Sequence, residues 1–243
     1  LHPDLSPAVS AEEGGGLLVT HWSKVFSVQP CCIAAQTAML NHCVVCPAEL
    51  QWNLEKDDFA CILARARDSA PGPDGLPYSA WANAPPAIHD EVYNMYIDLM
   101  AGTAVPPGFN HCYMACIPKG EAPDDHVGIA RLPESTRPIA MSNALAKILA
   151  MAINRALGTL APRTVLDRQR GVVRGRSVID NILETESMAI RFAKYYAAKS
   201  GIVLFDFAAA FPSIAHSWIF RVFSTMKVPA HLIRILEQLY ADC

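Results

Sequence analysis

A mixed α/β fold, in which helices cover a small sheet, is predicted by the order of apolar patterns along the chain. Residues 86–102 carry apolar side chains at helical spacing, with Pro86 in the first turn and Gly102 at the end. Residues 201–207, GIVLFDF, are a short run of β-forming residues, which predicts a buried strand. Helical patterns on both sides of this run give a helix–strand–helix order in the second half.

The remaining elements follow from the same periodicities. A strand is predicted at residues 111–118, ending at Pro118 and followed by a polar loop, and the glycines at 14–16 predict a linker. Ser213 is expected to cap the helix after the strand at 201–207, and Pro229 to open the last helix. Other helices are predicted at residues 33–40, at 57–70, from 142, and at 178–197.

The length and composition of the chain indicate a packed protein. Its 243 residues suit one large domain or two small ones, and 52% hydrophobic with 18% charged residues argues against disorder. No apolar run reaches the length of a bilayer span, and the start lacks the pattern of a signal peptide, so we expect no membrane association. The chain lacks an initial Met and stops at Cys243 just after a helical pattern, so we expect a fragment.

Basic residues gather in the middle of the chain. Residues 119–176 hold ten of the 20 Lys and Arg residues and five acidic ones, a local charge of +5 in a chain of net charge −3. Phosphate is a natural partner for such a region, and a solvated basic face is the alternative interpretation.

The eight cysteines are interpreted as thiols rather than as a disulfide framework. Cys43 and Cys46 have zinc-knuckle spacing, with His42 beside them and Cys31 and Cys32 upstream. A structural zinc site needs four well-spaced ligands, and one Cys-x-x-Cys pair does not supply them. We therefore expect no zinc here and interpret these residues as buried helix cysteines.

Asp206 closes the apolar run at 201–207, where a charge is costly unless something pairs with it. Carboxylate oxygens are the ligands that Mg²⁺ prefers. Together with the basic region, Asp206 predicts phosphoryl transfer with metal between enzyme and phosphates. The alternative is an Asp that bounds or caps a helix starting near Ala208.

Five motifs stand in a characteristic order. They are APGPDGLPYSAW at 70–81, IPKG at 117–120, RPIAMSNALAKILAMAINRAL at 137–157, QRGVVRGRSVIDNI at 169–182 and GIVLFDFAAAFPSI at 201–214. In this order and spacing, residues 57–243 resemble the reverse transcriptase domain of non-LTR (LINE-type) retrotransposons. The resemblance implies a right-hand polymerase, with residues 1–56 a variable lead-in, 57–200 the fingers, 201–243 a partial palm, and no thumb.

The resemblance also implies roles for individual residues. Asp206 matches the first catalytic aspartate, which would bind two Mg²⁺ ions, and the carbonyl of Phe207 would bind one. Phe211 matches the gate against a ribose 2′-hydroxyl; a core Phe is the alternative. Lys119 and Arg137 match the residues that hold the incoming triphosphate, and ordinary surface cations are the alternative.

Gln169, Arg170, Arg174 and Arg176 match the segment that the family uses near the template strand, where arginines would take phosphates. A basic turn before a helix is the alternative. The chain departs from the family pattern at Val172, where Phe is common. It departs again at Pro212, which follows the gate position where Asp is common. Both departures put template grip and activity in doubt but leave the metal ligand intact.

Residues 240–243, YADC, look like the family's second palm motif with one Asp lost, and we reject that interpretation. Only about 30 residues separate them from Asp206, and Leu236, Leu239 and Tyr240 continue a helical stripe. Asp242 is expected to be exposed at a helix end. The true Asp pair is expected beyond Cys243, so residues 1–243 should not extend a primer.

The sequence thus predicts a fragment of an RNA-directed DNA polymerase that uses an RNA template, a DNA primer and dNTPs. The family implies action in the nucleus and an endonuclease region that this chain does not show. Three alternatives remain: a group II intron-type reverse transcriptase or maturase, a decayed retroelement with at most weak RNA binding, and a nucleic-acid-binding module without polymerase ancestry.

Overall fold

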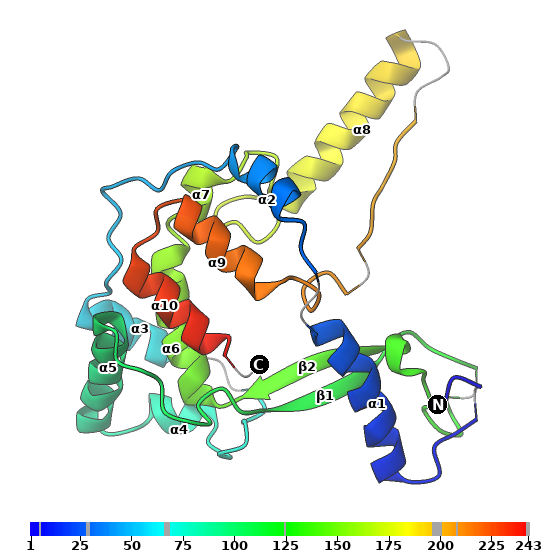
Figure 1. Ribbon diagram of the computed structural model, residues 1–243, viewed down its shortest axis with the longest axis horizontal. Coiled ribbons are helices and arrows are strands. Elements are labelled where there is room, and N and C mark those ends of the chain that lie inside the picture. The colour runs from blue at the N-terminus through cyan, green and yellow to red at the C-terminus, as the bar shows by residue number, and fades with distance from the viewer. Residues whose placement is uncertain are drawn as a thin grey trace.

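The computed structural model describes residues 1–4, 6–27, 30–65, 69–123, 125–195, 201–207 and 209–241. Over these residues the fold is helix-rich, with one two-stranded antiparallel sheet beside the main group of helices (Figure 1), which confirms the predicted mixed class. The elements are α1 (Ala11–Phe26), α2 (Ile33–Leu40), α3 (Lys56–Arg65), α4 (Tyr78–Ala82), α5 (Pro86–Ala101), β1 (Cys112–Pro118), a 3-10 turn (Pro133–Ser135), β2 (Thr136–Ser142), α6 (Ala144–Leu157), α7 (Ala161–Thr164), α8 (Val178–Tyr195), α9 (His216–Thr225) and α10 (Ala230–Leu239).

Helix α6 lies at the centre of the core. Its apolar residues recur at helical spacing, and Ile148, Leu149 and Ala152 are fully buried. Phe59 of α3 and Leu232 of α10 belong to the same cluster. One core therefore draws on all three stretches into which the sequence was divided, 1–56, 57–200 and 201–243.

By length and composition alone, the stretch Ala144–Thr164 is long and apolar enough to cross a membrane. No such stretch was expected from the sequence. The residues that make this stretch apolar are those of α6 that pack into the core. Their apolar character is explained by that packing.

The hairpin of β1 and β2 carries the first part of the candidate site. The predicted strand at 111–118 is confirmed as β1, whereas β2 was not predicted. The register pairs Cys116 with Pro138 and Ile117 with Arg137. Proline has no N–H to donate and is a poor strand signal, so β2 is decided by its pairing with β1 rather than by local preference.

The predicted linker at residues 14–16 is wrong, because these glycines lie inside α1. The Ser10 hydroxyl accepts from Glu13 N (3.1 Å) while the Glu13 carboxylate accepts from Val9 N (2.6 Å), a reciprocal cap that starts the helix. Trp22, 3% exposed, donates from Nε1 to Thr136 Oγ1 (3.2 Å) at the start of β2. The cap and this tertiary contact outweigh the helix penalty of the glycines.

The predicted buried strand at 201–207 does not form. These residues are assigned no strand, and their apolar side chains are exposed. Figure 1 shows them as an extended segment that runs back from the end of α8. A strand needs a hydrogen-bonded neighbour, and in the part of the chain that the structure describes only β1 and β2 pair.

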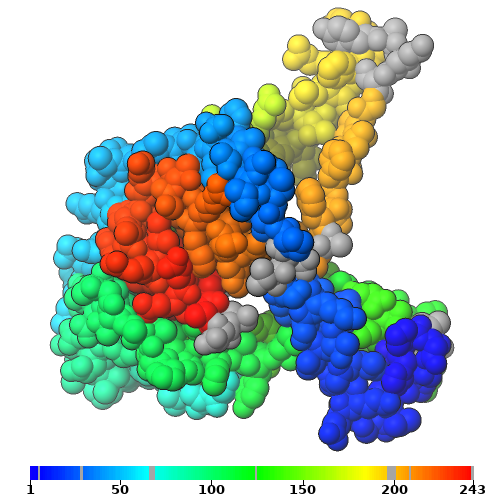
Figure 2. Space-filling model, viewed as in Figure 1, coloured from blue at the N-terminus to red at the C-terminus, as the bar shows by residue number. Residues whose placement is uncertain are grey.

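Helix α8 confirms the helical prediction from Val178 to Tyr195; residues 196–197 lie outside the described ranges. None of its residues is buried. Figure 2 shows α8 and the segment 201–207 standing out together from the rest of the molecule.

The last two helices pack on each other and on the core. Ala215 rather than Ser213 is the N-cap of α9, because the Ser213 hydroxyl donates to Ala210 O (3.2 Å) instead. Pro229 precedes α10 as predicted. Tyr240 is the C-cap of α10, so the predicted helical stripe is confirmed as far as Leu239, and the Tyr240 ring packs edge-on against His216 (ring centroids 4.7 Å apart).

Candidate triphosphate and nucleic-acid interface

The structure places Lys119 and Arg137 at the same end of the β1–β2 hairpin. Arg137 pairs with Ile117 in the ladder, and Lys119 N donates to Ser135 O (2.9 Å), which continues the pairing past Pro118. Side chains alternate along a strand, and directly paired residues share a face. Lys119 and Arg137 are therefore diagonal neighbours at this end of the hairpin.

The two cations differ in their present partners. Lys119 Nζ donates to the carbonyl of Glu134 (2.8 Å), a neutral acceptor that a phosphate oxygen would replace with a stronger, charge-assisted bond. The Arg137 side chain is exposed and contacts no hydrogen-bond or ion-pair partner among the described residues. Its planar fork is available to an anion.

Arg131 and Asp125 organise the loop between the two strands, a role that sequence reasoning missed. Arg131 Nη1 and Nη2 donate to the two Asp125 carboxylate oxygens, each at 2.7 Å. These bonds, with one from Ala122 N, lower the pKa of Asp125 from 3.8 to about 2. Opposite charges six residues apart in a Pro- and Gly-bearing loop give no periodic signal, so the sequence alone does not reveal the pair.

The turn at residues 71–75, PGPDG, holds the base of the hairpin. Asp74 N donates to Asn143 Oδ1 (3.1 Å) at the junction of β2 and α6. A Cβ on Gly72 would lie 2.4 Å from Asn143 N, so only glycine fits there without a shift of the backbone. The first matched motif therefore supports the strand that carries Arg137.

Asp206, Phe207 and Phe211 take no part in these hydrogen bonds. Asp206 is exposed and has no hydrogen bond or ion pair with a described residue. Phe211 is 85% exposed, so its interpretation as a core residue is wrong. Among the described residues, no hydrogen bond or ion pair joins 201–207 or 209–214 to Lys119 or Arg137. Ala208, where a helix was expected to start, lies outside the described residues.

The described residues do not form a two-magnesium site. Among them there is no group of three or more His, Cys, Asp or Glu side chains that could hold a metal ion. Asp206 offers one carboxylate, which is too little charge for two divalent cations. We therefore derive no metal-centred step from this arrangement.

The cysteines near α2 are not the buried helix residues that were expected. Cys31 and Cys32 are exposed before α2, and Cys43 and Cys46 follow its end and are half-buried. Cys46 N donates to Met226 O (2.7 Å), and burial raises the pKa of the Cys46 thiol. Tertiary contact of this loop, rather than a helix, decides their burial.

Two of the predicted nucleic-acid residues are engaged inside the chain. Arg176, 15% exposed, donates to the carbonyls of Leu166 (2.6 Å) and Gln169 (2.8 Å) and thereby closes the preceding loop. Arg170 Nη1 donates to Glu184 Oε2 (3.0 Å), which ties this loop to α8. Both terminal nitrogens of Arg176 and Nη1 of Arg170 are therefore bonded within the chain rather than presented to a ligand.

Arg174 is the exposed cation of this segment. It has no hydrogen-bond or ion-pair partner among the described residues, whereas the Gln169 amide donates to Gly171 O (3.1 Å). Val172 beside it is fully exposed with φ of 60°. A β-branched residue in this region is strained. The loop thus presents Val172 and Arg174 together at its tip.

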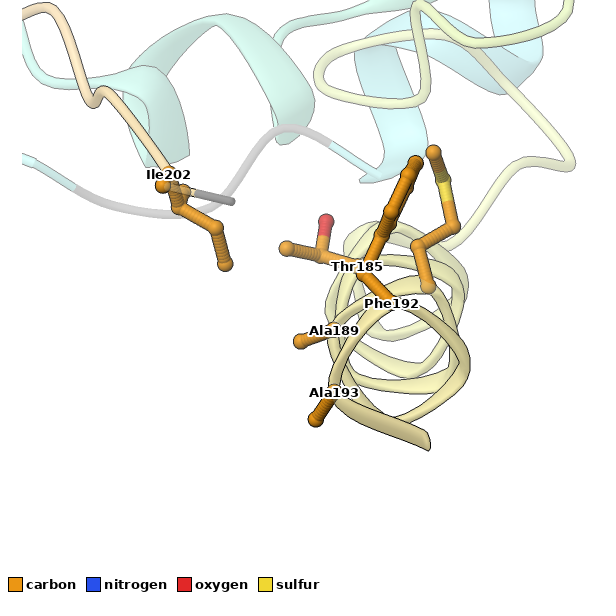
Figure 3. Close-up of a pocket in the computed structure, with 7 residues that line it drawn as sticks. Thr185, Ala189, Phe192, Ala193 and Ile202 are labelled. Atoms are coloured by element: carbon orange, nitrogen blue, oxygen red, sulfur yellow. The ribbon is translucent and has the colours of Figure 1, made fainter. Parts of the chain in front are cut away.

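An apolar groove of ≈ 710 Å³ lies between α8 and the start of the segment 201–207. Figure 3 shows Ile202 on one side, facing Thr185, Ala189, Phe192 and Ala193 of α8. None of the described residues that line this groove is charged. It does not fit a triphosphate, which the basic end of the hairpin suits better.

Comparison with known proteins gives the class of the chain. The family model for reverse transcriptase (RNA-dependent DNA polymerase) matches residues 117–241, just over half of the 243 residues. The chain belongs to the reverse transcriptase family. Membership implies nucleotidyl transfer, with a nucleic-acid template and primer and dNTPs as substrates. No match was found among curated proteins.

Proposed function

We propose that this chain carries the dNTP-binding fingers of an RNA-directed DNA polymerase from a non-LTR (LINE-type) retroelement. The observation that supports it most is the placement of Lys119 and Arg137 side by side at one end of the β1–β2 hairpin, inside the matched region. Lys119 would supply a point charge and Arg137 a two-pronged donor for phosphate oxygens. The subtype is favoured by the PGPDG turn, which precedes the matched region and packs against the base of the hairpin.

Triphosphate binding tests this proposal. The wild-type chain should bind fluorescent dTTP in the presence of Mg²⁺, and Arg137→Ala or Lys119→Ala should each weaken binding by about tenfold or more, the value of a charge-assisted hydrogen bond. Arg65→Ala, at an exposed position of α3, removes the same charge away from the hairpin and serves as the matched control. Equal affinities for Arg137→Ala and Arg65→Ala would contradict the proposal.

Asp206 remains our proposed magnesium ligand and catalytic aspartate, with the Phe207 carbonyl as a second donor and Phe211 as the sugar gate. Their exposure supports access to a ligand. One carboxylate does not hold two divalent ions, so we propose that residues 1–243 alone do not extend a primer. Mg²⁺-dependent DNA synthesis by the purified chain would contradict this, and it should be measured beside an Asp206→Asn control.

We also propose that the loop tip at Arg174 contacts RNA and that the parent protein acts in the nucleus. Arg174→Ala should weaken RNA binding and lower its salt dependence by about one phosphate contact. Arg176→Ala should instead lower the melting temperature, because Arg176 holds four backbone carbonyls of α7 and of the loop that follows it. An RNA affinity that Arg174→Ala leaves unchanged would remove the loop from the interface.

A further inference from the structure

We propose, on the basis of the proposed function, that Arg131 is a positioning residue for triphosphate binding. It holds the main chain of Lys119 and neutralises the carboxylate of Asp125 beside it. Arg131 itself would not touch the triphosphate, since its guanidinium is already engaged by the loop that joins β1 to β2.

The guanidinium of Arg131 is saturated. Nε donates to Lys119 O (3.2 Å) and Nη2 to Gly120 O (3.1 Å). Nη1 donates to Ala130 O (3.0 Å), and both terminal nitrogens donate to Asp125 (2.7 Å each). These contacts use the five N–H groups of an arginine. At 12% exposure the side chain is nearly withdrawn from solvent, so it is built into the loop.

These contacts fix Lys119 from one side, while Ser135, directly before β2, fixes it from the other. Lys119 N donates to Ser135 O (2.9 Å), and Lys119 O accepts from Arg131. The chain then turns at Gly120, whose φ is 63° and whose carbonyl accepts from Arg131 as well. With both main-chain groups held, the Lys119 side chain leaves the hairpin in a defined direction. Less freedom is then lost when it meets a phosphate.

Arg131 also has an electrostatic effect. Asp125 is an acid within the loop that follows Lys119, and its carboxylate is ionised at neutral pH, well above both its ordinary pKa of 3.8 and its lowered pKa of about 2. Paired with Arg131 it forms a neutral unit. Without Arg131 its unpaired negative charge would repel an approaching triphosphate, and salt would screen that repulsion beyond about 8 Å, the Debye length at physiological ionic strength. Loss of Arg131 therefore removes a hydrogen bond that holds the Lys119 main chain and leaves the negative charge of Asp125 unpaired.

A set of variants titrated with fluorescent dTTP in the presence of Mg²⁺ distinguishes the two contributions of Arg131, the hold on the Lys119 main chain and the neutralisation of Asp125. Arg131→Gln should raise the Kd about tenfold, and Asp125→Asn should leave it unchanged or lower it slightly, because a negative charge disappears. The double variant Arg131→Gln/Asp125→Asn should recover part of the loss. Arg131→Lys, which keeps the charge but not the fork, should fall between Arg131→Gln and wild type.

Thermal unfolding and RNA affinity provide the controls. Titrations are run well below the melting temperature of each variant, and Arg65→Gln is the charge-matched control. A purely structural Arg131 would lower the melting temperature and weaken RNA and dTTP binding together, without recovery in the double variant. That result, or an Arg131→Gln Kd within about twofold of wild type, would overturn the role of Arg131. The effect of Lys119→Ala on dTTP binding would still test the triphosphate site itself. A wild-type chain that binds no dTTP would overturn both the inference and the proposed function.

Discussion

Gly72→Ala is expected to separate the PGPDG turn from the junction of β2 and α6. The new Cβ would lie 2.4 Å from Asn143 N, 2.5 Å from Asn143 Oδ1 and 2.5 Å from the carbonyl carbon of Ser142. Two of these three atoms belong to the backbone, so no rotamer change relieves the overlap. The turn, the strand end or the start of α6 must move.

The magnitude follows from three contributions. Overpacking of a well-fitted contact costs about 1–3 kcal/mol. The bond from Asp74 N to Asn143 Oδ1, 3.1 Å long, is lost when the turn moves and contributes about 1 kcal/mol. Replacing glycine restricts the unfolded chain and returns about 0.4–1 kcal/mol. The net expectation is a loss of about 2 kcal/mol in the free energy of unfolding.

Urea unfolding followed by circular dichroism at the helix band measures this loss. For a chain of this size about 2 kcal/mol corresponds to a fall of about 4–8 °C in melting temperature. Gly128→Ala is the matched control, because no atom lies within 4 Å of its added Cβ and its φ is not positive. If Gly72→Ala and Gly128→Ala both melted within about 1 °C of wild type, the close approach of the turn to β2 would be refuted.

Three further changes test separate parts of the fold. A Cβ added at Gly16 inside α1 would have no neighbour within 4 Å, so Gly16→Ala should raise the free energy of unfolding by about 1 kcal/mol in a urea titration. Ile148→Ala removes a fully buried side chain of α6 and should lower it by about 2–5 kcal/mol in the same titration. Because the pKa of Asp125 falls from 3.8 to about 2 in the fold, ionised Asp125 stabilises the protein above pH 3.8, and this stabilisation fades as the pH falls through 2. The stability difference between wild type and Asp125→Asn should therefore be constant near neutrality and disappear toward pH 2, as measured by unfolding across that range; a difference that grows in acid would contradict the sign.

The elements that sequence reasoning predicted are those that local pattern decides. Helix α5 has an apolar stripe, a proline start and a glycine in the left-handed conformation at its end, with φ of 101° at Gly102. Helix α10 begins directly after Pro229 for the same local reasons. The segment 201–207 has an equally strong β pattern, yet a strand also requires a partner, and its own residues do not specify one. β2 shows the converse, since its pairing forms a strand through Pro138.

The residues of the candidate site also fall into two groups, those that the sequence identified and those that only the fold reveals. The resemblance picked out Lys119 and Arg137, and the register of the hairpin places them together. The resemblance did not distinguish Arg174, which is exposed, from Arg176, whose guanidinium is hydrogen-bonded to carbonyls of its own loop. Nor did it find Arg131, because the pairing with Asp125 depends on how the loop folds back. Residue type and order identify the basic residues that could bind phosphate. Only the fold decides which of their side chains are exposed and which are bonded within the chain.

A crystal structure of the chain grown with Mg²⁺ and dTTP tests the central claim most directly. We expect the triphosphate at the end of the β1–β2 hairpin where the connecting loop begins, with Lys119 Nζ turned from the Glu134 carbonyl to a phosphate oxygen and the Arg137 guanidinium on another. A triphosphate held instead by Arg174 in the loop before α8, with Lys119 still bonded to Glu134, would contradict the account.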